Sequence, residues 1–194
     1  MARRVRELAQ KARELKLADD VAVVFPDKNL EAAVREALEK PKGPLTRGDV
    51  KRLEQLNDGW LEIGNLSGIE HAINLTTLTL DENQISDVSP LASLTNLTKL
   101  YLWDNQISDV SPLASLTNLT TLYLWGNQIS DVSPLASLTN LTKLYLTKNQ
   151  ISDVSPLASL TNLTKLDLSN NSLSQKSIDV HVPNLKARGV SVSV

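Results

Sequence analysis

Aspartates at a fixed interval are the most regular candidates for metal chemistry in this sequence. Asp87, Asp109, Asp131 and Asp153 recur every 22 residues, and each stands two residues before a serine that precedes proline. Calcium takes about 6–8 oxygen ligands, usually from several carboxylates, whereas each of these positions brings one carboxylate. Aspartate also accepts hydrogen bonds from nearby backbone N–H groups in turns. We therefore expect a local turn at each aspartate, and neither a metal site nor a cofactor.

The residues that catalysis needs are sparse. The sequence contains two histidines, His71 and His181, and no cysteine. The two histidines fall near opposite ends of the repeats described below, so one molecule should not bring them into a shared site. The sequence shows no HExxH, no GxSxG, no phosphate-binding loop and no clustered carboxylate pair. These observations predict a protein without enzymatic activity.

Aromatic residues share the same interval as the aspartates. Tyr101, Tyr123 and Tyr145 are 22 residues apart, and Trp103 and Trp125 follow the first two at a distance of two residues. They account for all three tyrosines and for two of the three tryptophans. Because tyrosine and tryptophan are frequent in binding hot spots, a fold that stacked these intervals would create a candidate binding surface.

The interval belongs to a repeat of the whole sequence. The string ISDVSPLASLTNLT occurs without change at Ile85, Ile107, Ile129 and Ile151. The full unit, LTxLxLxxNQISDVSPLASLTN, begins at Leu75, Leu97, Leu119 and Leu141. A fifth copy from Leu163 departs from the pattern after Leu173, and a worn copy keeps the apolar spacing from Leu53. Such a period indicates a solenoid of stacked coils, in which each coil is stable only against its neighbours.

This leucine pattern resembles the leucine-rich repeat family, in its short bacterial internalin-like type. The resemblance covers residues 21–194. It implies an α/β fold: a right-handed solenoid with a parallel β-sheet on the concave face, short 3-10 and turn segments on the convex face, and a helical N-terminal cap. Partners of this family usually dock on the concave face, and its members are often secreted or displayed at the cell surface.

The residues of one coil predict the same structure from patterning alone. Leu100 and Leu102 alternate with outward residues and should point into the core from one strand. Asn105 follows, at a position that every coil repeats, and a buried asparagine must be hydrogen-bonded, which predicts an asparagine ladder. Ser111 is expected to cap a short helical turn that Pro112 opens.

The organisation follows from the repeat and its flanks. We expect an appended amphipathic helix at 1–20, a helical cap at 21–52, a degenerate first repeat at 53–74, four 22-residue repeats at 75–162, and a last partial repeat with a C-terminal cap at 163–194. In the N-terminal cap, one helical face should hold Leu30, Val34, Ala37 and Leu38. Thr46 with Asp49 is close to a capping box, and the alternating valines from Val190 to Val194 suit an edge strand.

The amphipathic helix expected at 1–20, which we call the leader helix, has two alternative packing partners. Val5, Leu8, Ala12 and Leu15 have 3-4-3 spacing, which suits either an extra helix packed on the cap or a weak pairing with a second chain. A monomer is the expected state. Charges interrupt the first 20 residues, so we expect no signal peptide, and no apolar run is long enough for a transmembrane helix. The sequence predicts a soluble protein of undetermined compartment.

The candidate ligand-binding residues are outward strand positions and the residues just after them. They are Lys99, Tyr101, Trp103, Asp104, Thr121, Tyr123, Trp125, Lys143, Tyr145, Thr147 and Lys148. The five rings would make a patch of several hundred Å², since a buried ring covers about 150–250 Å². A protein or peptide partner is expected first and a carbohydrate second, while a net charge of −2 argues against nucleic acid and membranes. Stacking of the rings only to stabilise the sheet is the alternative.

The uniformity of the repeat bears on its origin. The framework is identical in four copies, and variation is confined to the outward strand positions and the residues after them. This pattern favours a designed or consensus scaffold whose purpose is its shape. The alternative is a natural bacterial internalin-like surface protein that binds a host protein or a carbohydrate.

Overall fold

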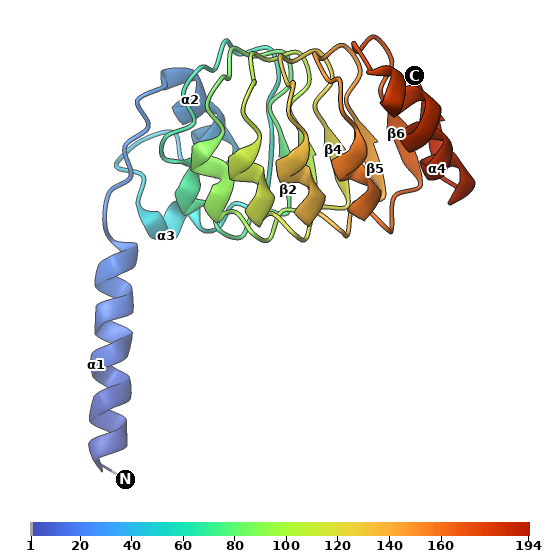
Figure 1. Cartoon of the computed structure of the whole chain (residues 1–194). Coiled ribbons are helices and arrows are strands. Elements are labelled where there is room, and N and C mark those ends of the chain that lie inside the picture. Colours follow the sequence, from blue (N-terminus) through green and yellow to red (C-terminus); the bar gives the residue numbers. More distant parts are fainter. Residues whose placement is uncertain (1) are drawn as a thin grey trace.

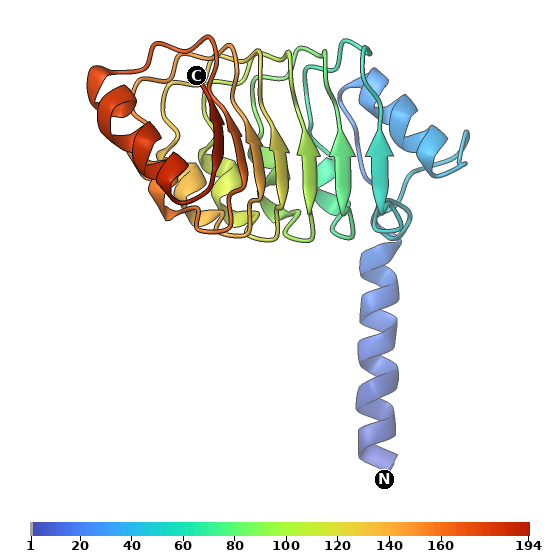
Figure 2. The ribbon, with the colours of Figure 1, turned by 90° about the vertical axis from the view of Figure 1, so that its right-hand side faces the viewer.

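The structure is a computed structural model that describes residues 2–194, without the side chains of residues 2, 3, 5, 9 and 12. Within these residues, seven three-residue strands form one parallel sheet in chain order (Figure 2). The strands are β1 (Gln55–Asn57), β2 (Thr77–Thr79), β3 (Lys99–Tyr101), β4 (Thr121–Tyr123), β5 (Lys143–Tyr145), β6 (Lys165–Asp167) and β7 (Ser191–Ser193). The predicted leucine-rich repeat solenoid is confirmed.

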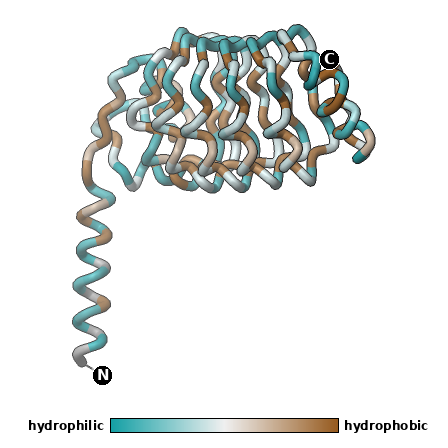
Figure 3. Tube along the Cα trace, viewed as in Figure 1, coloured by the Kyte–Doolittle hydropathy of each residue, from teal (hydrophilic) through white to brown (hydrophobic). Residues whose placement is uncertain are grey.

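Leucine at the centre of each repeat strand fixes the register. Leu100 pairs with Leu122, and Leu122 pairs with Leu144, so the same residue type lies against itself from coil to coil. All three are fully buried. Figure 3 shows the hydrophobic positions returning coil after coil. The residues on either side of each central leucine point outward, and we call their side of β1–β7 the sheet face.

Short 3-10 turns line the side opposite the sheet (Figure 1). They are η1 (Ile69–His71), η2 (Ser89–Ser93), η3 (Ser111–Ser115), η4 (Ser133–Ser137) and η5 (Ser155–Ser159). The prediction that Ser111 caps its turn is wrong, because the N-cap is Val110 and no side chain caps it. Instead the N–H of Ser111 donates to Asp109 at 2.8 Å, since a carboxylate two residues earlier already reaches that donor.

The asparagine ladder is present in the predicted register. The Oδ1 atom of Asn105 accepts a hydrogen bond from the N–H of Ile85, in the preceding coil, at 3.0 Å. Its Nδ2 atom donates to the carbonyl of Leu80 in the preceding coil and to that of Leu102 in its own. Each asparagine therefore satisfies buried backbone groups that the short strands leave unpaired.

The N-terminal cap contains α2 (Lys28–Ala37) and α3 (Arg47–Val50). Asp27 caps α2, and Thr46 with Asp49 forms the predicted capping box. The predicted apolar face of α2 is wrong at Ala37, which is exposed, while Ala33 is buried. Ala37 is the last residue of the helix and lines an open hollow beside β1, so its side chain stays accessible to solvent.

The C-terminal cap contains a helical segment that the sequence did not indicate. A π-helical turn, η6 (Ser177–His181), runs into α4 (Val182–Ala187), which buries Val182 and Leu185 against the last coil. The chain then returns as β7, the predicted edge strand, with Val190 buried and Val194 exposed. The core is thereby covered at this end by α4 and closed at the edge of the sheet by β7.

The leader forms α1 (Ala2–Asp19), which projects away from the solenoid (Figures 1 and 2). Lys51, just after α3, pairs with Asp19 and holds the last turn of α1. Leu8, Leu15 and Leu17 are exposed, so these apolar side chains do not pack on the cap, and α1 meets the cap near its C-terminal end. The predicted seam also includes the side chains of residues 5 and 12, which lie outside the description. Among the described residues, no helix combines the length and the apolar character needed to cross a membrane.

Candidate binding surface

Aromatic rings stack in two parallel columns across β3–β5. The rings of Tyr101 and Tyr123 lie 4.9 Å apart between centroids, and those of Tyr123 and Tyr145 lie 4.1 Å apart. Trp103 and Trp125 stack at 4.8 Å with their planes 7° apart. All five residues are half-buried, and each ring stacks on one neighbour, except that Tyr123 stacks on two. We call these five residues the aromatic ladder.

Lysines and threonines surround the aromatic ladder as the sequence places them. Lys99 and Lys143 are exposed at the starts of β3 and β5, and the half-buried Thr121 pairs with both. Thr147 is also half-buried and takes the place of a tryptophan one repeat after Trp125. The Nζ atom of Lys148 lies 5.5 Å from the centre of the Trp125 ring, within the range of a cation–π interaction.

Lys165 belongs to the same surface, although the sequence prediction left it out. Its Nζ atom lies 5.1 Å from the centre of the Tyr145 ring in the preceding coil. Lys165 continues the column of Lys99 and Lys143 by one more 22-residue step, a signal that would have included it.

Residues just after the strands adopt a left-handed backbone in every coil. The φ angles at this position are positive for Trp60, Glu82, Asp104, Gly126, Lys148 and Asn170. The absence of a Cβ atom at Gly126 leaves room for the Asp104 carboxylate, whose Oδ1 atom would lie 1.9 Å from that Cβ. Trp60 is the copy of this position in the first coil, and 73% of its surface is exposed. The sequence prediction left Trp60 out, although it lies one 22-residue interval before Glu82.

Hydroxyl groups in the tyrosine column are electrostatically unequal. Burial and a hydrogen bond with Tyr145 raise the pKa of Tyr123 to about 12. The hydrogen bond with Tyr123 and the nearby Lys165 ammonium lower the pKa of Tyr145. Tyr145 is therefore the tyrosine of this pair that ionises first.

Two carboxylates, Asp58 and Glu36, lie close together at the N-terminal end of the solenoid. Burial raises the pKa of Asp58, and repulsion by Glu36 adds to the effect. Asp58 stands where the following coils place an inward leucine, such as Leu80, and the repeat pattern alone marks it as an exception. It lines a hollow of about 330 Å³ between α2 and β1, together with Glu36 and the amides of the first strand.

Asp81 is the most enclosed carboxylate on this face. It is 9% exposed, and its Oδ1 atom has no hydrogen-bond partner. Burial raises its pKa above the usual value. A raised pKa in the folded state means that the native structure holds the proton more tightly than the unfolded chain, so ionisation at higher pH destabilises the fold.

Replacing Asp81 with asparagine is therefore expected to stabilise the protein near pH 7. We expect a gain of about 1 kcal/mol, the scale of a buried polar group without a partner, or a rise of about 2–4 °C in the unfolding midpoint. The gain should shrink as pH falls through the raised pKa, because both states are then protonated. Thermal unfolding at several pH values, with exposed Asp20→Asn as control, measures it. An equal gain at pH 3 and pH 7 would contradict the electrostatic cause.

The column of aspartates has local partners in its own turns. Asp87 accepts hydrogen bonds from the N–H of Ser89 at 2.8 Å and from its hydroxyl at 2.9 Å. Asp131 and Asp153 repeat both bonds, which lower their pKa values. These contacts match the turn role that the sequence predicted.

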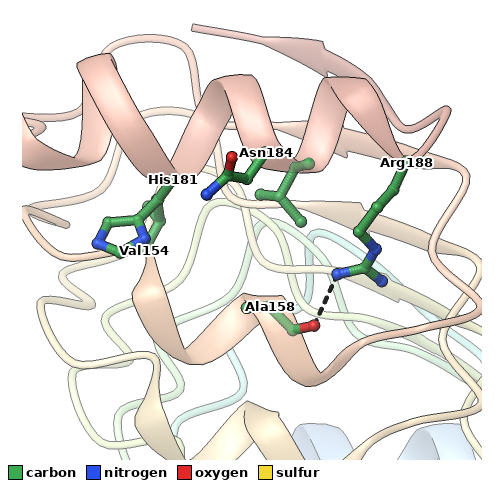
Figure 4. Close-up of a pocket in the computed structure, with 6 residues that line it drawn as sticks. Val154, Ala158, His181, Asn184 and Arg188 are labelled. Carbon is green, nitrogen blue, oxygen red and sulfur yellow. Dashed lines mark hydrogen bonds between the residues drawn. The ribbon is translucent and has the colours of Figure 1, made fainter.

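The two histidines lie at opposite ends of the solenoid. His71 belongs to η1 in the first coil, and His181 is the last residue of η6 and the N-cap of α4. His181 borders a small hollow of about 40 Å³ with Asn184 and Arg188 (Figure 4). The guanidinium of Arg188 donates to the carbonyl of Ala158 at 2.6 Å, which fastens α4 onto η5. This contact is structural, because it joins the cap to the last repeat.

Comparison with known proteins agrees with this architecture. The family model "Leucine Rich repeats (2 copies)" matches residues 73–115, 95–137, 117–159 and 139–180, which together cover more than half of the chain. The chain belongs to the leucine-rich repeat family, as its leucine pattern predicted. A search of curated proteins gives no match.

Solved structures place the chain beside the internalins of Listeria monocytogenes. Internalin InlF superimposes with a TM-score of 0.81 at 37% identity, over 87% of this chain and 49% of that one. Internalin C2 gives 0.53 at 32% identity, over 91% and 100%. The functional domain of InlJ, which includes a cysteine ladder, gives 0.61 at 28% identity, over 78% and 38%. The chain thus spans about half the length of the InlF chain. Folds of this internalin-like type are generally binding scaffolds without catalytic activity.

Proposed function

We propose that this chain is a non-catalytic scaffold that binds a protein or an extended peptide on the aromatic ladder. The observation that carries the proposal is that five aromatic rings are gathered on three adjacent strands of one outward face, where each remains half-exposed. The core does not need them, since leucines already fill it. Exposed patches of this kind are common at interaction sites.

The aromatic residues could contribute more energy to binding than to packing within the sheet. A cross-strand pair contributes about 0.2–1 kcal/mol to a sheet, whereas a tyrosine or tryptophan at the centre of an interface often contributes 2 kcal/mol or more. Lys148 and Lys165 lie against ring faces and leave the ring edges open. A partner that covers these edges would bury apolar surface without changing the stack.

The double substitution Tyr123→Thr with Trp125→Thr tests the proposal. We expect binding to a partner found on peptide arrays to weaken at least about 100-fold, because two central anchors are lost. The free energy of unfolding should fall by only about 1–2 kcal/mol from the broken stacks. Titration of the partner and urea unfolding measure the two effects.

A matched control is Thr77→Ala with Thr79→Ala, on the same face but outside the aromatic ladder. Loss of stability without loss of binding would contradict the proposal and favour a purely structural ladder. Glycan arrays, run in parallel, distinguish a carbohydrate partner, since rings also stack on sugars.

We also propose that the chain is a designed or consensus scaffold rather than a natural surface protein. Its support is the unchanged framework of four coils, in which substitution is confined to the outward strand positions and the left-handed position after them. A genomic copy that carries a secretion signal and a cell-wall anchor would contradict this proposal and favour the natural internalin-like alternative.

A further inference from the structure

Charges on the sheet face are divided between its two ends. Carboxylates occupy the coils of β2 and β3, where they outnumber Lys99 at the start of β3, and we call Asp81, Glu82 and Asp104 the acidic corner. Ammonium groups occupy the C-terminal coils, and we call Lys143, Lys148 and Lys165 the basic corner. The aromatic ladder on β3–β5 overlaps both corners, and its central residues, Tyr123 and Trp125, lie between them. The face therefore presents a charge gradient along the solenoid axis.

No ion pair neutralises the acidic corner. None of its three carboxylates forms an ion pair among the described residues, and the Oδ1 atom of Asp81 is buried without any partner. Burial raises the pKa of Glu82, and its neighbours Asp104 and Asp81 raise it further. Carboxylates that repel one another in this way are stabilised by an external cation.

The basic corner is likewise directed outward. Lys143, Lys148 and Lys165 are exposed, and two of them lie over ring faces. Asp167 is the one carboxylate of β6, and its pKa is lowered by bonds from Ser169 and Thr147 and by Lys165, although burial opposes them. Three ammonium groups against one carboxylate leave this corner positive.

The distance between the corners sets the length of an occupant. Four strand steps separate β2 from β6, or about 19 Å at about 4.8 Å per step. An extended peptide covers that distance with about six residues, at about 3.3 Å per residue. The central residues of such a peptide would lie across the aromatic ladder.

We infer that the sheet face binds an extended segment of a partner protein whose charges are divided in the opposite sense. Lysine or arginine side chains lie over the acidic corner, apolar or aromatic side chains cross the aromatic ladder, and aspartate or glutamate side chains lie over the basic corner. This inference rests on the proposed function and specifies its partner. Complementary charge sets the orientation and the choice of partner more than it sets affinity.

A display selection tests the charge pattern. Random peptides of about 12 residues, enough to span the two corners, are selected against the full chain at low salt. We expect the enriched peptides to carry basic residues at one end, acidic residues at the other and apolar residues between. The double variant Lys148→Glu with Lys165→Glu turns the second corner acidic. Selection against it should enrich peptides that are basic at both ends, and the original peptides should bind it about 10-fold more weakly.

The matched control is Lys176→Glu with Lys186→Glu, which makes the same change in net charge on exposed residues of the C-terminal cap. It should leave the selected peptides unchanged. No enrichment, enriched peptides without divided charges, or the same peptides from both double variants would overturn the inference. So would a dimer, detected by light scattering and lost in Lys148→Glu with Lys165→Glu, since the same charges complement themselves about a two-fold axis.

The selection also separates this inference from the proposed function. Peptides that lack divided charges but lose binding with Tyr123→Thr and Trp125→Thr would sink the inference and leave the proposed function standing. Peptides that bind regardless of both the ladder and the corners would overturn both.

Discussion

Replacing Asn127 with alanine is expected to lower the free energy of unfolding by about 3–5 kcal/mol. The side chain is 7% exposed, and its Oδ1 atom accepts the N–H of Ile107 at 2.9 Å. Its Nδ2 atom donates to the carbonyls of Leu102 and Leu124 at 2.9 and 3.1 Å. Alanine would leave these buried backbone groups without partners, and each such group costs about 1–3 kcal/mol.

Urea unfolding followed by circular dichroism measures the effect. Asn118→Ala is the matched control, because its exposed side chain makes one hydrogen bond, to the carbonyl of Thr95. We expect that control to cost about 1 kcal/mol or less, since water replaces the lost bond. Equal losses in the two variants would show that the asparagine ladder is not a principal source of stability. A broadened transition in Asn127→Ala alone would indicate that the two halves of the array unfold separately.

Gly68→Ala is expected to destabilise the protein by about 3 kcal/mol, from backbone strain together with overpacking. Gly68 has a φ angle of +103°, which favours glycine. A Cβ atom there would lie 2.7 Å from the ring of Phe25 and 3.0 Å from the carbonyl oxygen of Val24. In the later coils this position holds proline, so the glycine makes room for the N-terminal cap.

Gly43→Ala separates the two causes. Its φ angle is +82°, but a Cβ atom would meet nothing within 4 Å, so only the strain remains, about 1 kcal/mol. Thermal unfolding of both variants gives the difference. A loss in Gly68→Ala no larger than that in Gly43→Ala would mean that Phe25 shifts without cost and that the cap is loosely packed.

The interior of the solenoid could be predicted from the sequence, because a shift by one coil gives each repeated residue the same surroundings. Leu122 meets Leu100 and Leu144, and Asn127 bonds the coil before it as Asn105 does. One coil therefore predicts the rest, including the face on which the aromatic ladder lies. The exception was Ser111. Its side chain was expected to cap the turn, but its N–H instead donates a hydrogen bond to Asp109.

The ends and the electrostatics were decided by tertiary structure. Ala37 is exposed and Asp58 is half-buried because the cap and the first coil meet without a repeated neighbour. The turn into α4 depends on covering the last coil, and Lys165 reaches Tyr145 only because stacking brings consecutive coils together. Periodicity determined which residues share an environment. Packing determined what that environment is wherever the periodicity ends.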